Sequence, residues 1–495
     1  MSAPAAMMTE ETLAQIAKAQ SSGILESTGI YSYDLSELVS LIPVVTPWRD
    51  IVPRTTSPDG NPFAVWRALM DANSAQPDPS MGFDYAANEV VFDEQDFQAR
   101  YVPTGYAGLV TQDAFDLAKG YGDPYAIATF QTLNQVLIGD DRKQMGAQSF
   151  ALAACSAPTL TQSASGGSIG AVAVHVGVAA RTGSGYYYGS GNSQGAAGST
   201  TFASGSANSV TATVPAVRGA MCYDWFYSAD GTTWYYYTTT TVNTVVITKT
   251  ITSNQALPNL PDLATGWKGT ANSVPTFLST GDNGSANAND YDGFVASLTG
   301  DYNGSGRWVQ PGTGTANPAV WTSLDGAALT LSGGSVAEIE EYIFLALWNQ
   351  VKCSPTALMM NAATAQSIAN LILAQPSAVT YLQTDEAGRV NTTGGGRVGQ
   401  LVNAPAGGVT VPIEVHVSLP PGTIIARTDR VPFPQAGMTS VIEQRCLRDT
   451  AQFDYGISRV ANTAGGGPRK EFEIRSVSAF INRAPVAMAL LQNVA

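Results

Sequence analysis

The chain has little of what most enzymes and nucleic-acid-binding proteins rely on. It contains only two histidines in 495 residues, His175 and His416, and both stand in candidate strands. A Ser-His-Asp triad needs a histidine base beside its nucleophile, so this scarcity argues against such a site. Charged residues make up only 13% of the chain, and the net charge is −14. Tight nucleic-acid binding needs clustered Lys and Arg, so this charge balance argues against a tight binder. It does not exclude a protein that encloses nucleic acid without binding it tightly.

Cysteine and long apolar runs are also scarce. The four cysteines are far apart and form no CxxC pair: Cys155, Cys222, Cys353 and Cys446. We therefore expect no zinc site and no disulfide framework, but four reduced and mostly buried thiols. No apolar run is long enough to span a membrane. Residues 1–15 lack the basic and apolar regions of a secretory signal, so we expect neither membrane insertion nor Sec-type export.

What is present indicates an ordered, sheet-rich chain with one prominent helix. The length is enough for two to four domains with sizeable cores. The stretch from Asp123 to Gln148 predicts a long amphipathic helix, with Asp123 as its N-cap and Pro124 in its first turn. Apolar residues recur in it at helical spacing and predict a buried stripe: Ile127, Phe130, Leu133, Leu137 and Ile138. Gly139 and Gly146 weaken the second half of this helix, so the sequence does not define the residue at which it ends.

The chain before this helix predicts arms rather than a compact domain. Residues 62–69 and 98–110 read as two strands, and an acidic, proline-containing tip lies between them. Such a hairpin is longer than ordinary surface loops, which usually signals a binding role. Residues 28–54 are broken into extended pieces by prolines. Residues 9–20 predict a short helix that becomes ordered on a neighbour.

The chain after the helix predicts a sandwich and then an α+β region. Residues 156–256 are rich in Ser, Thr, Gly, Tyr and Val, and their strand and turn signals are typical of a small β-sandwich. The aromatic run 220–248 resembles an immunoglobulin-like or fibronectin type III domain. Residues 257–334 predict a linker and irregular loops.

Helices and strands return after this linker. Residues 335–350 predict a helix that opens with a capping box made by Ser335 and Glu338, and residues 361–373 predict a second helix. A buried strand is expected between them at 353–360. Late strands are expected at 409–417, 422–428, 439–445 and 470–481, with a last one in the apolar end, 484–495.

Two motifs match catalytic or cofactor signatures outside the context that those signatures need. Gly191–Gly195 matches GxSxG around Ser193, but no helix follows, so a nucleophile elbow is not predicted. Gly394–Gly399 matches GxGxxG, but the next residues will not form a helix, so a loop is favoured over a dinucleotide site.

An acidic cluster and three sequons are equally weak signals. Asp282, Asp290 and Asp292 lack the spacing and the terminal Glu of an EF-hand, which favours a solvated loop and leaves only weak cation binding open. The sequons at Asn283, Asn303 and Asn391 are chance matches in the absence of a signal peptide. We therefore predict no catalytic, cofactor-binding or metal-binding residues, and a chain that is not an enzyme.

The order of these parts resembles the major capsid proteins of tailed double-stranded-DNA bacteriophages, which have the Hong Kong 97-like α+β fold. The matching stretches are residues 28–54 as N-arm, 62–69 with 98–110 as E-loop, the helix from Asp123 as spine helix, 335–373 as axial domain, and the late strands. The resemblance implies seven parts: an N-terminal arm (1–56), an E-loop hairpin (57–110), a peripheral domain (111–155), an immunoglobulin-like insertion (156–256), a linker (257–334), an axial domain (335–430) and closing strands (431–495).

The resemblance implies a structural role in a virion. Copies would assemble in the host bacterial cytoplasm into hexamers and pentamers that close an icosahedral shell around packaged DNA, without sequence-specific binding. Scaffold, portal and decoration proteins are the implied partners, and a host-surface glycan is a candidate ligand of the insertion. Some members join their shells through an E-loop lysine, but residues 57–110 contain none, so no such crosslink is expected. The loop around Arg397 is expected near a capsomer axis.

Two other function classes remain open. An extracellular adhesin or carbohydrate-binding protein would explain a fibronectin-like domain, but the missing signal peptide and the long arms count against it. A phage tail or tube protein is also self-assembling and rich in strands. The long helix and the two-helix region make that class less favoured.

Overall fold

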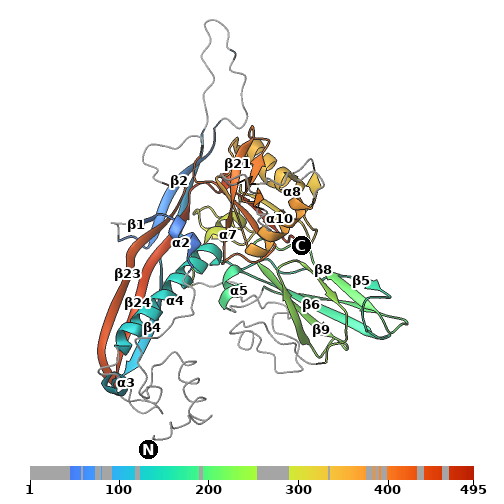
Figure 1. Ribbon diagram of the computed structural model, residues 1–495, viewed down its shortest axis with the longest axis horizontal. Helices are drawn as coiled ribbons and strands as arrows, with labels where there is room; N and C mark the ends of the chain where they lie inside the picture. The colour runs from blue at the N-terminus through green and yellow to red at the C-terminus, as the bar shows by residue number, and fades with distance from the viewer. Residues whose placement is uncertain are drawn as a thin grey trace, which may run out of the picture.

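The computed structural model describes residues 45–56, 60–72, 80, 92–117, 123–188, 193–252, 289–332, 335–374, 383–384, 390–391, 398–431, 440–459 and 468–495. They form a long sheet crossed by one helix, a projecting hairpin, a six-stranded sheet domain and a β-sandwich (Figure 1). The predicted α+β class is confirmed. The helix predicted at 9–20 lies outside the described residues.

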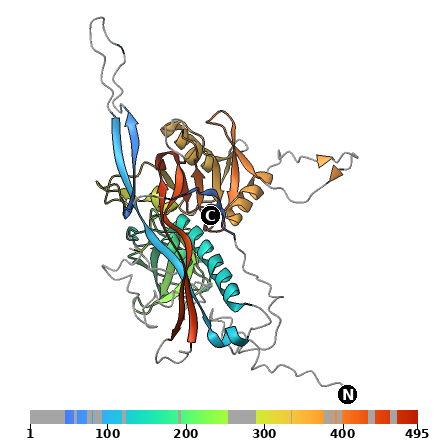
Figure 2. The same cartoon turned by 90° about the vertical axis from the view of Figure 1, so that its left-hand side faces the viewer.

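The long sheet carries the long helix on one face. Its strand order is β1 (Arg54–Thr56), β23 (Ile442–Arg459), β24 (Pro468–Asn482) and β4 (Val102–Thr111). Helix α4 (Pro124–Gly146) lies along this sheet (Figures 1 and 2). Val136 packs there against Phe472 and Ile474 of β24. Gly108 on β4 makes room for this layer, because a Cβ at that position would lie 2.3 Å from the Phe472 ring.

Helix α4 begins as the sequence predicts but buries a different face. Asp123 Oδ1 accepts hydrogen bonds from the backbone N–H of Tyr125 at 2.9 Å and of Ala126 at 3.4 Å, so the predicted cap is confirmed. The helix ends at Gly146. The predicted apolar stripe is confirmed as a core contact only at Leu133, which packs against the cluster of Val136, Phe472 and Ile474. Phe130 is 58% exposed, and the buried positions are others: Pro124, Asn134, Val136, Asp140, Asp141, Gln144, Met145 and Gly146. In the second half of the helix the buried side chains are mostly polar, and a search for periodic apolar residues does not find them.

The hairpin is formed by β2 (Phe63–Ala72) and β3 (Phe92–Arg100), which pair antiparallel as a sheet of two strands. The predicted strand at 98–110 is wrong as one element, since it is divided at Tyr101. Its first residues end β3, and β4 begins at Val102 and pairs with β24 in the long sheet. The short helix α3 (Gln112–Leu117) follows β4. Figure 2 shows the hairpin rising away from the body.

Part of the region predicted as a linker contributes to the core. Residues 289–332 include α7 (Phe294–Thr299), β12 (Asp301–Tyr302), β13 (Trp308–Val309), β14 (Val320–Ser323) and β15 (Leu331–Ser332). Phe294 and Leu298 are fully buried. The sequence hid this packing because the apolar residues are short islands between Gly, Asn and Ser. Residues 257–288 lie outside the described residues.

The six-stranded sheet has the order β14, β25 (Ala489–Gln492), β22 (Ile424–Arg427), β17 (Ala357–Met360), β21 (Val409–Val415) and β20 (Gln400–Asn403). A continuous helical stretch, made of α8 (Ala337–Ile339), a π-helix (Glu340–Leu345) and α9 (Ala346–Val351), packs against it together with α10 (Ala362–Leu373). The buried strand and the last strand occur where the sequence predicts them. A 3₁₀ turn (Pro485–Ala487) precedes β25, and β18 (Gln383–Thr384) pairs with β19 (Val390–Asn391).

The predicted capping box is wrong. Ser335 lies in β16 (Ser335–Val336), and its hydroxyl donates to Glu340, whereas Glu338 accepts from the Thr330 backbone N–H at 2.8 Å. The pairing of β15 with β16 places Ser335 one residue too early to cap a helix that begins at Ala337.

Seven strands form the sandwich, in two sheets. One has the order β10 (Tyr235–Thr240), β9 (Cys222–Ser228), β6 (Ala173–Arg181) and β7 (Ala196–Thr201); the other has β11 (Thr244–Ile247), β8 (Ser209–Thr213) and β5 (Thr159–Ser163). Val176, Trp225, Val210 and Ile247 from both sheets share one core. Its immunoglobulin-like class stays a prediction. Among the described helices, no segment is long and apolar enough to cross a membrane.

Candidate functional site: the junction at the end of helix α4

The motifs singled out in the sequence do not come together. Ser193 is fully buried and accepts a hydrogen bond from the Ala180 backbone N–H at 2.9 Å, and strand β7, not a helix, follows it. Of the GxGxxG match only Val398 and Gly399 are described, and strand β20 comes next. His175 lies in the sandwich and His416 beside the six-stranded sheet. The four cysteines are buried and free, as predicted.

The structure divides the acidic cluster between separate contacts. Asp290 forms an ion pair with Lys143 of α4 at 2.7 Å and accepts from the Ser184 hydroxyl at 3.0 Å. Asp292 instead accepts from the Ser149 backbone N–H at 2.8 Å, and burial raises the pKa of Asp292 to about 6. Asp282 lies outside the described residues. No group of three or more His, Cys, Asp or Glu that could hold a metal occurs among the residues the structure describes.

What the structure does assemble is a polar junction at the end of α4, centred on Asp140 and Asp141. Asp140 is 4% exposed. Its carboxylate contacts Arg49 Nε at 3.2 Å and Arg54 at 3.6 Å, and it accepts from Gln444 at 2.9 Å and Gln144 at 3.1 Å. Burial raises the pKa of Asp140, while the two guanidiniums oppose that rise. This carboxylate therefore ties the N-terminal segment and strand β23 to α4.

Asp141 holds the start of a short helix from the N-terminal segment. Its Oδ1 accepts from the backbone N–H groups of Trp48 at 2.9 Å and Arg49 at 3.0 Å, which begin α2 (Pro47–Ile51). Its Oδ2 accepts from the Ser418 hydroxyl at 2.7 Å, so one carboxylate joins α2, α4 and the six-stranded domain. Burial raises the pKa of Asp141. The sequence predicted extended pieces here; the structure has a helical turn because Asp141 satisfies its first N–H groups.

Trp48 is the apolar counterpart of these contacts. It is fully buried and stacks on Phe294 of α7 with ring centroids 4.6 Å apart. Phe480 of β24 and the imidazole of His416 lie around it, at 6.2 and 6.3 Å. His416 Nδ1 accepts from the Ser418 backbone N–H at 3.1 Å, and burial lowers the pKa of His416 to about 4. The N-terminal segment is thus fixed to the body through one aromatic side chain and one carboxylate pair.

The sandwich side of the molecule also packs against this end of α4. Gly146 and Gly183 cross at close range, because a Cβ on either would lie within 3 Å of the other residue's backbone. Arg142 of α4 covers the Tyr187 ring in α5 (Gly183–Tyr188) at 5.0 Å. Gly293 lies equally close to the carbonyls at the end of α4. Small residues therefore let three backbones meet at this point.

The hairpin is attached to the body mainly through one face. Trp66 and Phe97 stack with centroids 5.8 Å apart, and Phe97 stacks on Trp308 at 5.5 Å. Gly306, with φ of +72°, accepts at its carbonyl from the Gln98 backbone N–H at 3.1 Å. The opposite face is open: Val65 is 52% exposed, and Arg67 forms ion pairs with Glu94 and Asp96 in solvent.

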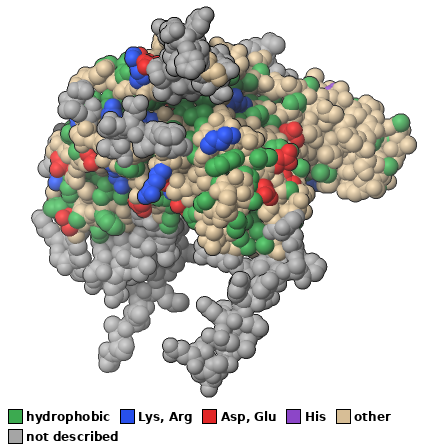
Figure 3. Space-filling model, turned by 90° about the horizontal axis from the view of Figure 1, so that it is seen from above, with side chains coloured by type: hydrophobic (Ala, Val, Ile, Leu, Met, Phe, Trp, Pro, Cys, Tyr) green, Lys and Arg blue, Asp and Glu red, His purple; other side chains and the backbone are tan. Residues whose placement is uncertain are grey.

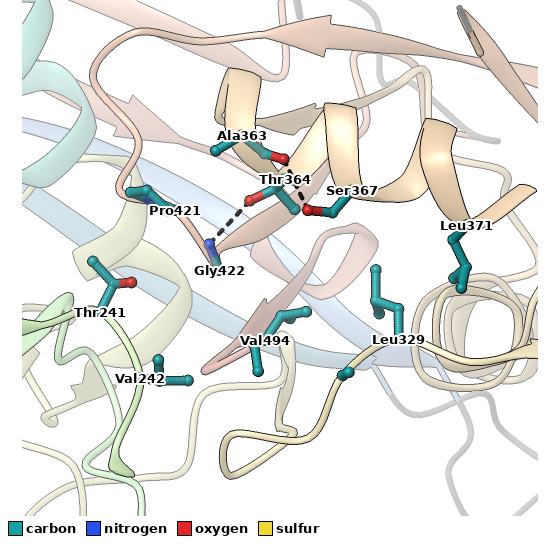
Figure 4. Close-up of a pocket in the computed structure, with 12 residues that line it drawn as sticks. Thr241, Val242, Leu329, Ala363, Thr364, Ser367, Leu371, Pro421, Gly422 and Val494 are labelled. Atoms are coloured by element: carbon teal, nitrogen blue, oxygen red, sulfur yellow. Dashed lines mark hydrogen bonds between the residues drawn. The ribbon is translucent and has the colours of Figure 1, made fainter. Parts of the chain in front are cut away.

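A cavity of about 310 Å³ lies between the sandwich, the six-stranded domain and the last residues (Figure 4). Thr364 Oγ1 accepts from the Gly422 backbone N–H at 3.0 Å, and the Ser367 hydroxyl donates to the Ala363 carbonyl at 3.1 Å. Both hydroxyls are thus used by the backbone, and the other labelled residues are mostly apolar. We assign no ligand to this cavity.

The sequence missed the residues that make the junction. Asp140 and Asp141 read as an ordinary polar turn of a helix, and Trp48 as one apolar residue among several in an arm. One signal was present in the sequence: two adjacent aspartates follow an apolar stretch of the predicted helix. Carboxylates at such a position must either face solvent or find partners within the fold. Nothing in the sequence identifies Arg49, Gln444 and Ser418 as the partners, because they are distant along the chain.

Comparisons with known proteins give structural likenesses only. No protein-family model matches the sequence, and no curated protein matches it. The chain is similar to the capsid of a native GTA particle, with 9% identity, 94% of this chain and 97% of that chain covered, and a TM-score of 0.41. It is similar to the capsid of the cyanophage P-SCSP1u (9%, 94% and 92%, 0.36) and to the holo-SrpI encapsulin complex of Synechococcus elongatus (9%, 94% and 96%, 0.35).

Proposed function

We propose that this chain is a structural major capsid protein of the Hong Kong 97-like class. Its copies assemble into hexamers and pentamers that form the icosahedral shell of a tailed bacteriophage around packaged double-stranded DNA. The observation that carries the proposal is the hairpin β2–β3, which projects from the body and leaves one face open. A ribbon of two strands is marginal on its own in water. Contacts with a neighbouring copy would cover its open face and its edges.

The construction of the body supports the same proposal. The junction fixes the N-terminal segment, the sandwich, the six-stranded domain and the long sheet to one end of α4. A subunit of a closed shell needs such a rigid body, because small errors in its angles accumulate around the shell. The charge balance also fits, since a net charge of −14 gives a wall little attraction for DNA and no sequence-specific grip.

The proposal includes the partners and the place that a shell requires. Assembly takes place in the host bacterial cytoplasm, with a scaffold, a portal and decoration proteins as partners, and the product is the virion capsid. The hairpin forms no isopeptide bond, because residues 57–110 contain no Lys to supply its amine. The chain acts structurally and not as an enzyme.

The sandwich is the outer module of this proposal, with a host-surface glycan as its candidate ligand. Residues 157–250 contain few charged residues: Arg181, Arg218, Asp224, Asp230 and Lys249. Arg181 and Asp224 form a fully buried ion pair. Figure 3 shows the resulting surface, on which coloured side chains are sparse over the lobe at the right. Hydroxyl and amide groups without net charge suit hydrogen bonding to a neutral sugar.

The role of the hairpin can be tested with one substitution and a matched control. Val65→Asp adds a charge to the open face of β2, which is 52% exposed, so the subunit should keep the melting temperature of the wild type. If that face packs on a neighbouring copy, a buried unpaired carboxylate there abolishes shells in sedimentation velocity. Val246→Asp, at a 51% exposed position of the sandwich, should leave assembly intact. Shells formed by Val65→Asp at the wild-type yield would contradict the proposal.

A further inference from the structure

The side of α4 that faces away from the long sheet carries an apolar line. Ile127, Phe130, Asn134, Leu137 and Asp141 follow one another at intervals of three and four residues, so they lie on one face of the helix. Val136, which packs on the sheet, points the other way. Phe130 is 58% exposed, and Ile127 and Leu137 are half-buried. Asn134 and Asp141 of the same series are buried, so the exposed part of this face is confined to its apolar members. We call Ile127, Phe130 and Leu137 the outer line; apolar side chains that stay partly exposed together on one helix face favour a partner that covers them.

The outer line leads directly to the point where the N-terminal segment is anchored. Asp141 is the last residue of the series, and its carboxylate binds the backbone N–H groups of Trp48 and Arg49. Thr46 is 8% exposed, whereas Val45 is 49% exposed, so burial of the described chain begins at Thr46. Val45, the first described residue, therefore lies next to a fixed attachment at the Asp141 end of the outer line.

The chain that leaves this anchor has the length and the chemistry to cover the outer line. Residues 28–44 carry several apolar side chains within a short distance of the anchor: Leu38, Leu41, Ile42 and Val44. From Ile127 to Asp141 the helix rises roughly 21 Å, at 1.5 Å per residue. An extended segment rises roughly 3.3 Å per residue, so about seven residues are enough to follow that distance. The attachment at Thr46–Arg49 also lowers the entropic cost of docking, because one end of the segment is already in place.

We propose that residues 28–44 of this same chain dock along the outer line of α4, with their apolar side chains against Ile127, Phe130 and Leu137. The contact is a binding surface for the protein's own N-terminal segment, and it makes α4 a helix that is covered on both sides. The inference does not depend on the proposed function, since it concerns one subunit.

Hydrogen–deuterium exchange of the full chain tests the docking. In the wild-type subunit, amides within 35–44 should exchange at least about tenfold more slowly than in an unstructured peptide of the same sequence. Phe130→Asp should remove that protection and leave α4 and the melting temperature unchanged, because Phe130 contributes little to the core. Phe115→Asp, at a 40% exposed position of α3 outside the outer line, should retain it. Unprotected amides within 35–44 in the wild type, or protection that survives Phe130→Asp, would overturn the inference.

A disulfide experiment identifies which copy supplies the segment. The double variant Val44→Cys/Leu137→Cys should form a crosslinked monomer on mild oxidation, since the four natural cysteines are buried. A crosslinked dimer that increases with protein concentration would show that a second copy supplies the segment, which contradicts docking within one chain. The single variant Leu137→Cys should give no crosslinked monomer and serves as the control.

Discussion

At the scale of single residues, the junction depends on buried titratable side chains, and burial disfavours the charged form of each. Asp140 and Asp141 are held by guanidinium, amide and backbone partners, yet burial still raises the pKa of both. His416 is buried in its neutral form beside Trp48. The sequence placed both histidines in candidate strands and favoured a structural role for them. It could not predict the burial of His416, because that depends on Trp48 entering from a segment that precedes it by more than three hundred residues.

The lowered pKa of His416 predicts a loss of stability in acid. Unfolded histidine has a pKa near 6.5 and the folded group one of about 4, so the unfolded chain binds the proton more tightly between these values. The stability that neutral His416 provides is complete above pH 6.5 and is lost as the pH falls through 4. The difference in pKa corresponds to about 3 kcal/mol at most.

His416→Asn isolates this effect, because asparagine retains an acceptor for the Ser418 backbone N–H and does not titrate. We expect urea unfolding of the variant to show a smaller drop in free energy from pH 7 to pH 4 than the wild type. The raised pKa values of Asp140, Asp141 and Asp292 act in the opposite direction and are common to both proteins. Equal pH slopes for the two proteins would contradict the burial of a neutral imidazole.

At the scale of elements, local chemistry in the sequence predicted starts of helices better than faces. Asp123 caps α4 as expected, because an N-cap needs only the residues next to it. Asn361, the first residue of the second predicted helix, caps α10. The buried face of α4 was predicted wrongly at Phe130, which is 58% exposed, and in the second half of the helix, where the buried residues are mostly polar. The division of the hairpin's second strand at Tyr101 also depends on distant β24, which takes the residues from Val102 onward.

The contact between α2 and α4 gives a prediction with a built-in control. Asp141→Ala removes the acceptor for Trp48, Arg49 and Ser418 and leaves their donors buried, which should destabilise the protein by about 2 kcal/mol. Asp141→Asn keeps one acceptor oxygen and should remain close to the wild type. Unfolding by urea gives the free energies, and hydrogen exchange of residues 45–52 should become faster in the alanine variant only. An alanine variant as stable as the wild type would show that the carboxylate does not anchor α2.

At the scale of the whole molecule, the sequence contains signals for separate parts but none for their attachment. Composition marks the sandwich, helical periodicity marks α4, and the extended segments before α4 indicate arms. The attachment rests on small residues in close contact, such as Gly146 with Gly183, and on single ion pairs such as Lys143 with Asp290. These pairs have no sequence signature, because each partner is ordinary in its own surroundings. The proposal of a shell follows from the combination of a fixed body and an open arm.

The proposed shell is tested most directly by electron microscopy of the purified full-length chain at high concentration. The account predicts closed shells, or rings of five and six copies, and a single band near 51.7 kDa when the same particles are run on a denaturing gel. The band should be single because the hairpin has no lysine to form an interchain bond. A chain that stays monomeric at every concentration, in microscopy and in sedimentation, would contradict the account.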